Sequence, residues 1–184
     1  MRLIIGLGNP DKEYLQTRHN FGWLSLDNLA EKYQLNWTKN KTSNCLITDF
    51  ISGREKIILA KPLTYMNESG QTVRALKNFF KLPNNKIIII CDDLDLPFGD
   101  IKLSKNKNSG GHKGLDSIIA QLKSKDFKRV RLGIGPKIGP AEDFVLQKFS
   151  LEEKDKLKEI LDTSNLIVET ILEKSFDQAT NEYN

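Results

Sequence analysis

The stretch Arg2-Leu3-Ile4-Ile5-Gly6-Leu7-Gly8-Asn9-Pro10 decides the fold class of this chain. Its first part is apolar and of strand length, and the Gly-Asn-Pro segment that follows favours a turn. Polar residues at the carboxyl ends of buried strands in α/β proteins commonly line the ligand crevice. We therefore expect a buried strand here, with the chemistry of the protein starting where that strand ends.

The remaining sequence alternates between strand and helix patterns, which is typical of the α/β class. Further strands are expected at 45–50, 56–60, 86–91, 101–103 and 129–134, the first two as an antiparallel pair. Helices are expected at about 20–33, from 69 to before 83, at 114–122, and from about 150. We predict one domain over residues 1–184, a three-layer sandwich with a mixed, largely parallel central sheet flanked by helices.

Composition narrows the class of protein. A chain of 184 residues with 39% hydrophobic content suits one ordinary domain. The longest apolar stretches fall well short of the roughly 18 to 20 residues of a membrane helix, and no signal-peptide cleavage pattern follows the first of them. Cys45 and Cys91 form neither a CxxC pair nor a disulfide framework. We expect a soluble cytoplasmic protein.

Positive charge is concentrated on either side of one glycine-rich loop. The net charge of +4 is too small to identify a partner by itself. The loop Gly110-Gly111-His112-Lys113-Gly114 lies between two lysine- and arginine-rich segments, at 102–113 and 123–131. The loop either only starts a helix or uses backbone N–H groups and nearby lysines to bind phosphate.

The two histidines, His19 and His112, each lie at the edge of a predicted element. A lone histidine is more often structural than catalytic, but histidine is also the commonest acid–base group near neutral pH. His19 follows the first strand's polar turn, which favours a functional role. Asp92, Asp93 and Asp95 follow the strand at 86–91 and form either a solvated acidic loop or a partner that orients the imidazole. The spacing does not decide which aspartate does so.

Several familiar motifs are missing. The sequence has no HExxH, paired CxxC or DxDxDG pattern for a metal, no third glycine for a dinucleotide fingerprint, and no GxSxG serine elbow. No metal or organic cofactor is therefore expected. Asn67 lies directly before the second predicted helix, where it either caps that helix or hydrogen-bonds a substrate amide.

Four ordered blocks resemble the bacterial-type peptidyl-tRNA hydrolase family across most of the chain. The first comprises Gly6-Leu7-Gly8-Asn9-Pro10, Tyr14, Thr17-Arg18-His19-Asn20 and Gly22. The second comprises Lys61-Pro62, Thr64-Tyr65-Met66-Asn67 and Ser69-Gly70. The third runs from Asp92 to Pro97 with Gly99, and continues with Gly110-Gly111-His112, Gly114-Leu115 and Ser117-Ile118. The fourth is Arg131-Leu132-Gly133-Ile134-Gly135.

The resemblance implies a monomeric enzyme that hydrolyses the ester between a peptide and the terminal ribose of tRNA, without a cofactor. It makes His19 the general base and Asp92 the carboxylate that orients it. Residues implied to bind or line the substrate site are Asn9, Tyr14, Asn20, Tyr65, Met66, Asn67, His112 and Lys113. Contacts to tRNA phosphates are expected from Lys102, Lys105, Lys107 and Arg131.

Two positions depart from the family pattern. Lys113 stands where the family usually has asparagine, and Pro136-Lys137 replaces the usual basic residue and proline. A lysine donates hydrogen bonds but cannot accept one as an amide oxygen does. Lys113 therefore keeps open the alternative of a non-catalytic RNA-binding relative of the same fold. A small-molecule α/β esterase is a further, weaker alternative.

Overall fold

A computed structural model describes residues 1–184 and contains one seven-stranded sheet. The strands are β1 (Arg2–Gly6), β2 (Thr38–Asn40), β3 (Cys45–Ser52), β4 (Glu55–Pro62), β5 (Ile87–Pro97), β6 (Ile101–Lys105) and β7 (Lys128–Gly135). Their order in the sheet is β2-β3-β4-β1-β5-β7-β6. The four central strands β4, β1, β5 and β7 are parallel, and the pairings β2–β3, β3–β4 and β6–β7 are antiparallel. The predicted mixed, largely parallel sheet is confirmed.

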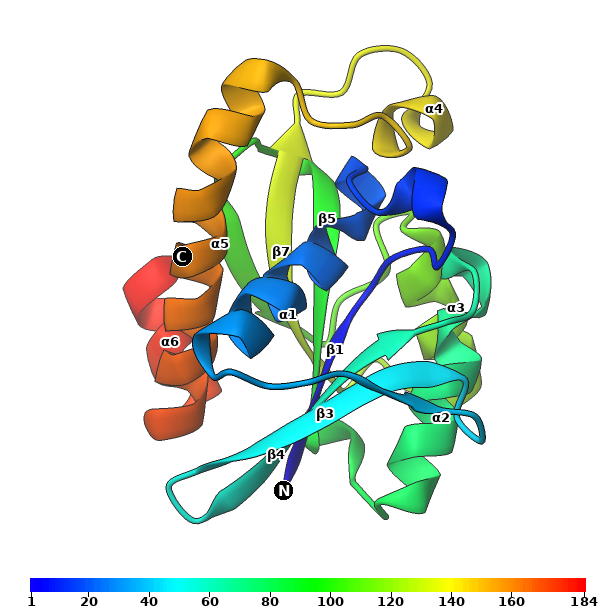
Figure 1. Ribbon diagram of the computed structural model, residues 1–184, viewed down its shortest axis with the longest axis vertical. Coiled ribbons are helices and arrows are strands. Elements are labelled where there is room, and N and C mark those ends of the chain that lie inside the picture. Colours follow the sequence, from blue (N-terminus) through cyan, green and yellow to red (C-terminus); the bar gives the residue numbers. More distant parts are fainter.

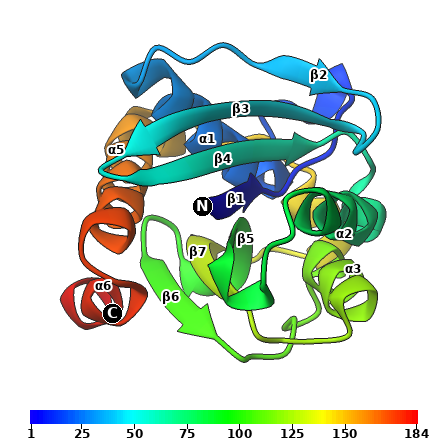
Figure 2. The same ribbon diagram turned by 90° about the horizontal axis from the view of Figure 1, so that it is seen from below.

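Helices cover both faces of this sheet, which gives three layers (Figures 1 and 2). They are α1 (Phe21–Lys32), α2 (Ser69–Phe79), α3 (Lys113–Leu122), α4 (Ala141–Val145), α5 (Leu151–Glu173) and α6 (Phe176–Tyr183). Short 3-10 turns lie at Lys12–Tyr14, Arg18–Asn20, Met66–Glu68 and Asn84–Lys86. Helices α1, α5 and α6 lie on one face and α2 and α3 on the other (Figure 2). No helix has the length and apolar composition needed to cross a membrane.

The central strands bury side chains on both faces because a layer of helices covers each one. In β1, Ile4 packs into the cluster with α1 and α5, whereas Leu3 and Ile5 pack into the cluster with α2 and α3. In β5, Ile88 and Ile89 point to opposite clusters in the same way. The alternation of side chains along a strand therefore divides one apolar run between two cores.

The structure changes several predicted boundaries. The strand expected at 86–91 continues to Pro97, so the acidic residues lie within β5 and not in a loop, and its pairing with β7 shifts register between Asp93 and Pro97. The helical tail is two helices, because α5 ends at Glu173 and Ser175 caps a separate α6. The short elements β2 and α4 were not predicted, since three and five residues are too few to show a period.

Gly22 allows α1 to cross the sheet at very close range. A Cβ atom on this residue would lie 2.3 Å from the carbonyl oxygen of Ile90 in β5 and 2.6 Å from the backbone nitrogen of Leu7. These distances leave no room for any side chain. The start of α1 is thereby held against the carboxyl end of β1 and against Ile90 of β5.

Candidate active site

The site lies where β1 ends beside β5, toward the upper edge of the sheet in Figure 1. The strands that follow β1 in the sequence, β2 to β4, lie on one side of it in the sheet, whereas β5 lies on its other side. In open α/β sheets, a crevice forms outside the strand ends at the point where the strand order reverses in this way. Asn9 follows β1, and Asp92 lies in β5. His19 comes from the 3-10 turn before α1, and His112 from the position before α3. Four elements thus bring four distant residues together.

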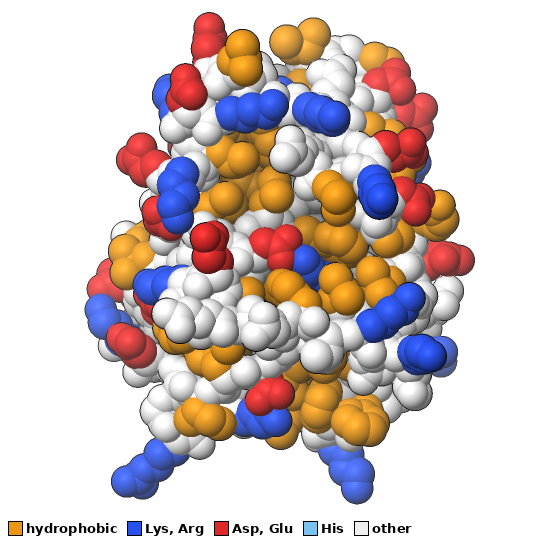
Figure 3. Space-filling model, viewed as in Figure 1, with side chains coloured by type: hydrophobic (Ala, Val, Ile, Leu, Met, Phe, Trp, Pro, Cys, Tyr) orange, Lys and Arg blue, Asp and Glu red, His pale blue; other side chains and the backbone are white.

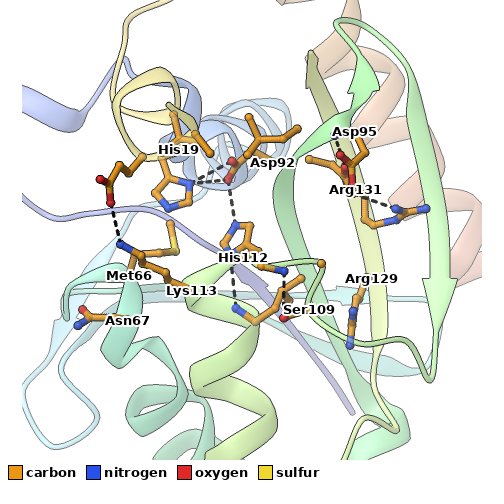
Figure 4. Close-up of a pocket in the computed structure, with 18 of the residues that line it drawn as sticks. His19, Met66, Asn67, Asp92, Asp95, Ser109, His112, Lys113, Arg129 and Arg131 are labelled. Carbon is orange, nitrogen blue, oxygen red and sulfur yellow. Dashed lines mark hydrogen bonds and ion pairs between the residues drawn. The ribbon is translucent and has the colours of Figure 1, made fainter. Parts of the chain in front are cut away.

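His19 and Asp92 form a buried pair, as expected from the sequence (Figure 4). The Nδ1 atom of His19 lies 2.9 Å and 3.0 Å from the two carboxylate oxygens of Asp92. His19 is 8% exposed and Asp92 only 3%. Because Asp93 and Asp95 make no such contact, the structure selects one of the three aspartates.

The buried carboxylate of Asp92 is held in its ionised form. Burial by itself would raise its pKa, but attraction to His19 and His112 and the hydrogen bonds from both rings outweigh it and lower the pKa well below its ordinary value of 3.8. An ionised carboxylate can only accept hydrogen bonds. The Nδ1 atom of His19 therefore carries a proton, and its Nε2 atom is left with a lone pair.

His112 is a second imidazole partner of the same carboxylate. Its Nε2 atom lies 3.1 Å from Oδ1 of Asp92, and its ring centroid is 4.9 Å from that of His19. Figure 4 shows both rings directed at Asp92. The resemblance implied that His112 binds or lines the substrate site, and the structure adds its direct contact with the carboxylate of Asp92.

Asn9 is fixed by its neighbours. Its Oδ1 atom accepts a hydrogen bond from the backbone nitrogen of Met66 at 2.8 Å, which leaves the amide nitrogen as the group free to donate. Asn20 has no exposed surface and holds Asn9 through two hydrogen bonds to its backbone, of 2.8 Å and 2.9 Å. Asn20 thus supports the wall of the site instead of lining it.

These residues lie at a cavity of about 810 Å³. Of the expected substrate residues, the cavity is lined by Asn9, Tyr65, Met66, Asn67, His112 and Lys113, together with His19 and Asp92. Tyr14 is partly exposed but is not part of this lining. Asn67 is exposed, and Glu68 is the N-cap residue of α2 without a side-chain cap bond, so the capping role considered for Asn67 is not observed. Asn67 instead belongs to the lining of the cavity.

Lys113 reaches across the mouth of the cavity. Its side chain is 66% exposed, and its ammonium lies 3.7 Å from a carboxylate oxygen of Glu142 in α4. An exposed pair at this distance contributes little stability, about 0 to 1 kcal/mol. The lysine that departs from the family pattern is therefore available to a ligand.

The four expected phosphate contacts divide into two groups. Lys107 and Arg131 line the main cavity, and Arg131 also pairs with Asp93 at 2.9 Å. Lys102 instead donates to the backbone oxygen of Asn184, and Lys105 pairs with Asp177 at 2.6 Å. The two groups lie in different surroundings, although all four belong to the basic segments of the sequence.

Several lining residues were not among the predicted site residues. Arg129 is 1% exposed, its guanidinium donates to backbone oxygens of Lys107 and Asn108, and it borders the cavity without a carboxylate partner. Ala141, Glu142 and Val145 of α4 form another part of the wall. Their positions depend on folding of the long connection between β7 and α5, which no local pattern predicts.

Arg18 fastens that connection beside His19. Its guanidinium makes two hydrogen bonds to Glu153, of 2.9 Å and 2.6 Å, and another to the backbone oxygen of Lys148. It also lies 4.6 Å over the ring of Phe144. The residue next to the candidate base thus anchors the segment that carries α4.

His19, Asp92 and His112 are also the one group of side chains in the structure close enough to share a metal ion, with their ligand atoms within 4.8 Å of one another. Metal-bound histidines almost always donate a hydrogen bond through their second ring nitrogen. In His112 the second nitrogen, Nδ1, instead accepts from the backbone nitrogens of Gly114 and Leu115. This arrangement favours a hydrogen-bonded acid–base site over a metal centre.

Together these features define an α/β protein with a buried histidine–aspartate pair at a cavity beside the carboxyl end of β1. A sequence model of the family described as peptidyl-tRNA hydrolase matches residues 3–184. Relatives of that name from Clostridium botulinum and Bacillus subtilis are each 41% identical to this chain, over all of it and over 96% and 98% of their own lengths. The chain belongs to the peptidyl-tRNA hydrolase family.

Solved structures agree with this assignment. A crystal structure of peptidyl-tRNA hydrolase from Acinetobacter baumannii is 33% identical, covers 100% of this chain and 94% of its own, and superposes with a TM-score of 0.93. A nucleosidase from Arabidopsis thaliana, 9% identical with a TM-score of 0.52, shares only the fold. The resemblance seen in the four sequence blocks is confirmed.

Proposed function

We propose that this protein hydrolyses the ester bond between a peptide and the terminal ribose of tRNA, and that His19 is its general base. The observation that carries the proposal is the buried His19–Asp92 pair at the edge of a cavity, in a chain that belongs to the peptidyl-tRNA hydrolase family. We further propose that residues 1–184 act as one domain, as a monomer and in the cytoplasm.

In this mechanism His19 activates a water molecule. Its Nε2 atom takes a proton as the water oxygen attacks the ester carbonyl, and Asp92 stabilises the imidazolium that forms. Collapse of the tetrahedral intermediate breaks the carbon–oxygen bond to the ribose, and the proton returns from Nε2 to the ribose oxygen. The products are a free peptide and a tRNA with its terminal hydroxyl restored.

The cavity walls supply positioning groups for this reaction. We assign Asn9 and Asn67, which line the cavity, the role of donating to carbonyl oxygens of the peptide through their amide nitrogens. We assign Lys107 and Arg131, which line the same cavity, the role of contacting phosphates of the tRNA. General-base catalysis typically supplies about a hundred- to ten-thousand-fold in rate, which suits an activated ester without a covalent intermediate.

The test is release of peptide by the purified protein. Peptidyl-tRNA and free aminoacyl-tRNA are incubated with the protein in the presence of a chelator, and we expect hydrolysis of the former with a strong preference over the latter. Binding of peptidyl-tRNA without release would instead support the non-catalytic RNA-binding alternative. Rapid hydrolysis of simple esters with neither tRNA substrate cleaved would support a small-molecule esterase.

A further inference from the structure

The proton on His112 can be placed from its hydrogen bonds. His112 is the N-cap residue of α3, and its Nδ1 atom lies 3.1 Å from the backbone nitrogen of Gly114 and 3.4 Å from that of Leu115. Backbone N–H groups in the first turn of a helix have no partner within the helix, and they can only donate. Nδ1 of His112 must therefore be the acceptor and carry no proton.

The other ring nitrogen then has the opposite role. A neutral imidazole has one N–H and one lone pair, so Nε2 of His112 carries the proton. This atom lies 3.1 Å from Oδ1 of Asp92, which therefore accepts a hydrogen bond from it. The same carboxylate accepts a second hydrogen bond from Nδ1 of His19 at 2.9 Å. The hydrogen bonds form a directed chain from the backbone of α3, through His112 and Asp92, to His19.

We propose that His112 is a positioning residue, through which the first turn of α3 fixes Asp92 and thereby the reactive tautomer of His19. The inference rests on the proposed function, because His112 acts through the base. With the Nε2 proton of His112 on one side and the Nδ1 proton of His19 on the other, the carboxylate of Asp92 is held in one orientation. His19 is then held with Nδ1 protonated and the lone pair of Nε2 available to water.

This series of hydrogen bonds also keeps the imidazole of His112 neutral while the imidazole of His19 takes up a proton. A proton on Nδ1 of His112 would face two N–H donors and the positive end of the α3 dipole. The two ring centroids are only 4.9 Å apart, so a second positive charge would oppose the imidazolium that forms on His19. Fixing His112 as the neutral Nε2–H tautomer removes that opposition.

Two amide variants separate the two hydrogen-bonding roles of His112, which are capping the start of α3 through Nδ1 and donating to Asp92 through Nε2. In His112→Asn the amide lies near the position of Nδ1 and keeps a good N-cap for α3, but no donor reaches Asp92. In His112→Gln the amide nitrogen lies near the position of Nε2 and still donates to Asp92. We expect kcat for peptidyl-tRNA to be at least about tenfold higher in His112→Gln than in His112→Asn, which loses about ten- to a hundredfold relative to wild type, as when an imidazole loses an orienting partner.

A merely structural His112 predicts the reverse order, because His112→Asn is the better helix cap. Equal rates in the two variants, or a faster His112→Asn, overturn the inference. Substrate affinity and thermal unfolding are measured alongside, and we expect KM to change little in both variants and His112→Asn to be at least as stable as His112→Gln.

Nitrogen NMR of His19 and His112 tests the proposed series of hydrogen bonds without any substrate. In the wild-type protein at neutral pH, we expect His112 to be protonated only at Nε2 and His19 predominantly at Nδ1. In His112→Asn, His19 should become a mixture of tautomers. Protonation of His112 at Nδ1, or an unchanged His19 tautomer in His112→Asn, overturns the inference. A wild-type protein that showed the expected tautomers but released no peptide would contradict the proposed function alone.

Discussion

At the scale of single residues, His19 is the group on which the proposed chemistry depends. Its Nδ1 atom is occupied by Asp92, and only Nε2 remains for a water molecule. We expect His19→Ala to lower kcat by about a hundred- to ten-thousand-fold, the usual contribution of a general base, while tRNA affinity stays close to that of the wild type. Single-turnover hydrolysis and a binding titration measure the two quantities. Near-native turnover in this variant would show that the base lies elsewhere.

Asp92 provides a second test at this scale, through the dependence of stability on pH. Its folded-state pKa lies below the ordinary value of 3.8, so its ionised form stabilises the folded protein. This contribution is complete above pH 3.8 and is lost as the pH falls through the lower folded-state pKa. We expect Asp92→Asn to be clearly less stable than the wild type at pH 6, with the difference shrinking below pH 3.8.

Denaturant unfolding at a series of pH values measures this difference. Asp49→Asn is a matched control, because Asp49 is an exposed carboxylate paired with Lys56 at 3.0 Å. The control should change the free energy of unfolding by less than about 1 kcal/mol at any pH. A stability difference for Asp92→Asn that is constant from pH 6 to acid would contradict the assignment of an ionised Asp92.

At the scale of elements, the contact between α1 and β5 holds His19 and Asp92, the two members of the proposed catalytic pair, together. Gly22 is the point of closest approach, where an added Cβ would lie 2.3 Å from the carbonyl oxygen of Ile90. We expect Gly22→Ala to destabilise the protein by about 1 to 3 kcal/mol, as overpacking of a well-packed core does. It should also reduce turnover, because a displacement of about 1 Å at a reacting group can cost about a hundredfold in rate.

Thermal unfolding and peptide release are the measurements for this variant. Glu31→Ala is the control, since Glu31 is an exposed residue of the same helix and alanine favours helix formation. If Gly22→Ala were as stable and as active as Glu31→Ala, the close packing of α1 on β5 would not be what positions His19.

At the scale of the whole molecule, the face shown in Figure 3 carries both basic and acidic side chains and no large block of one sign. On the face shown in Figure 3, basic and acidic side chains alternate around the rim, and apolar side chains gather toward the middle. Recognition of tRNA is therefore expected to depend on where individual basic residues lie relative to the cavity, and not on the net charge of +4.

Lys107 and Lys105 test this view, because they are two residues apart but differ in surroundings. Lys107 is exposed and lines the main cavity, whereas Lys105 is paired with Asp177 and lines a separate pocket. We expect Lys107→Ala to weaken tRNA binding and to lower the slope of log Kd against log salt by about one. Lys105→Ala should have the smaller effect on both, and titrations at several salt concentrations compare them. A larger effect of Lys105→Ala would place the tRNA on the other side of β6.

The local sequence pattern was sufficient for the main architecture and for the candidate base. Apolar runs such as Leu3 to Leu7 and Ile87 to Cys91 have few alternatives to buried strands, and helical periodicity located α1, α2, α3 and α5. The limits of the local pattern are seen at β5, where the preference of Asp92 and Asp93 for turns is overridden by their pairing with β7. The pairing partner of a strand is not encoded in that strand's own residues.

Tertiary packing alone selected the contacts of the site. Asp92 and His19 are 73 positions apart, Arg131 and Asp93 are 38 apart, and the α4 wall is fastened through Arg18 and Glu153 across 135 positions. Spacing along a chain carries no information on such distances, which depend on how strands and helices pack. The proposed role of His112 also depends on packing and not on sequence spacing. The tautomer of an imidazole is set by the donors and acceptors that the fold places at its two nitrogens. The sequence predicts which side chains can carry the chemistry, and the packing decides which of their atoms face one another.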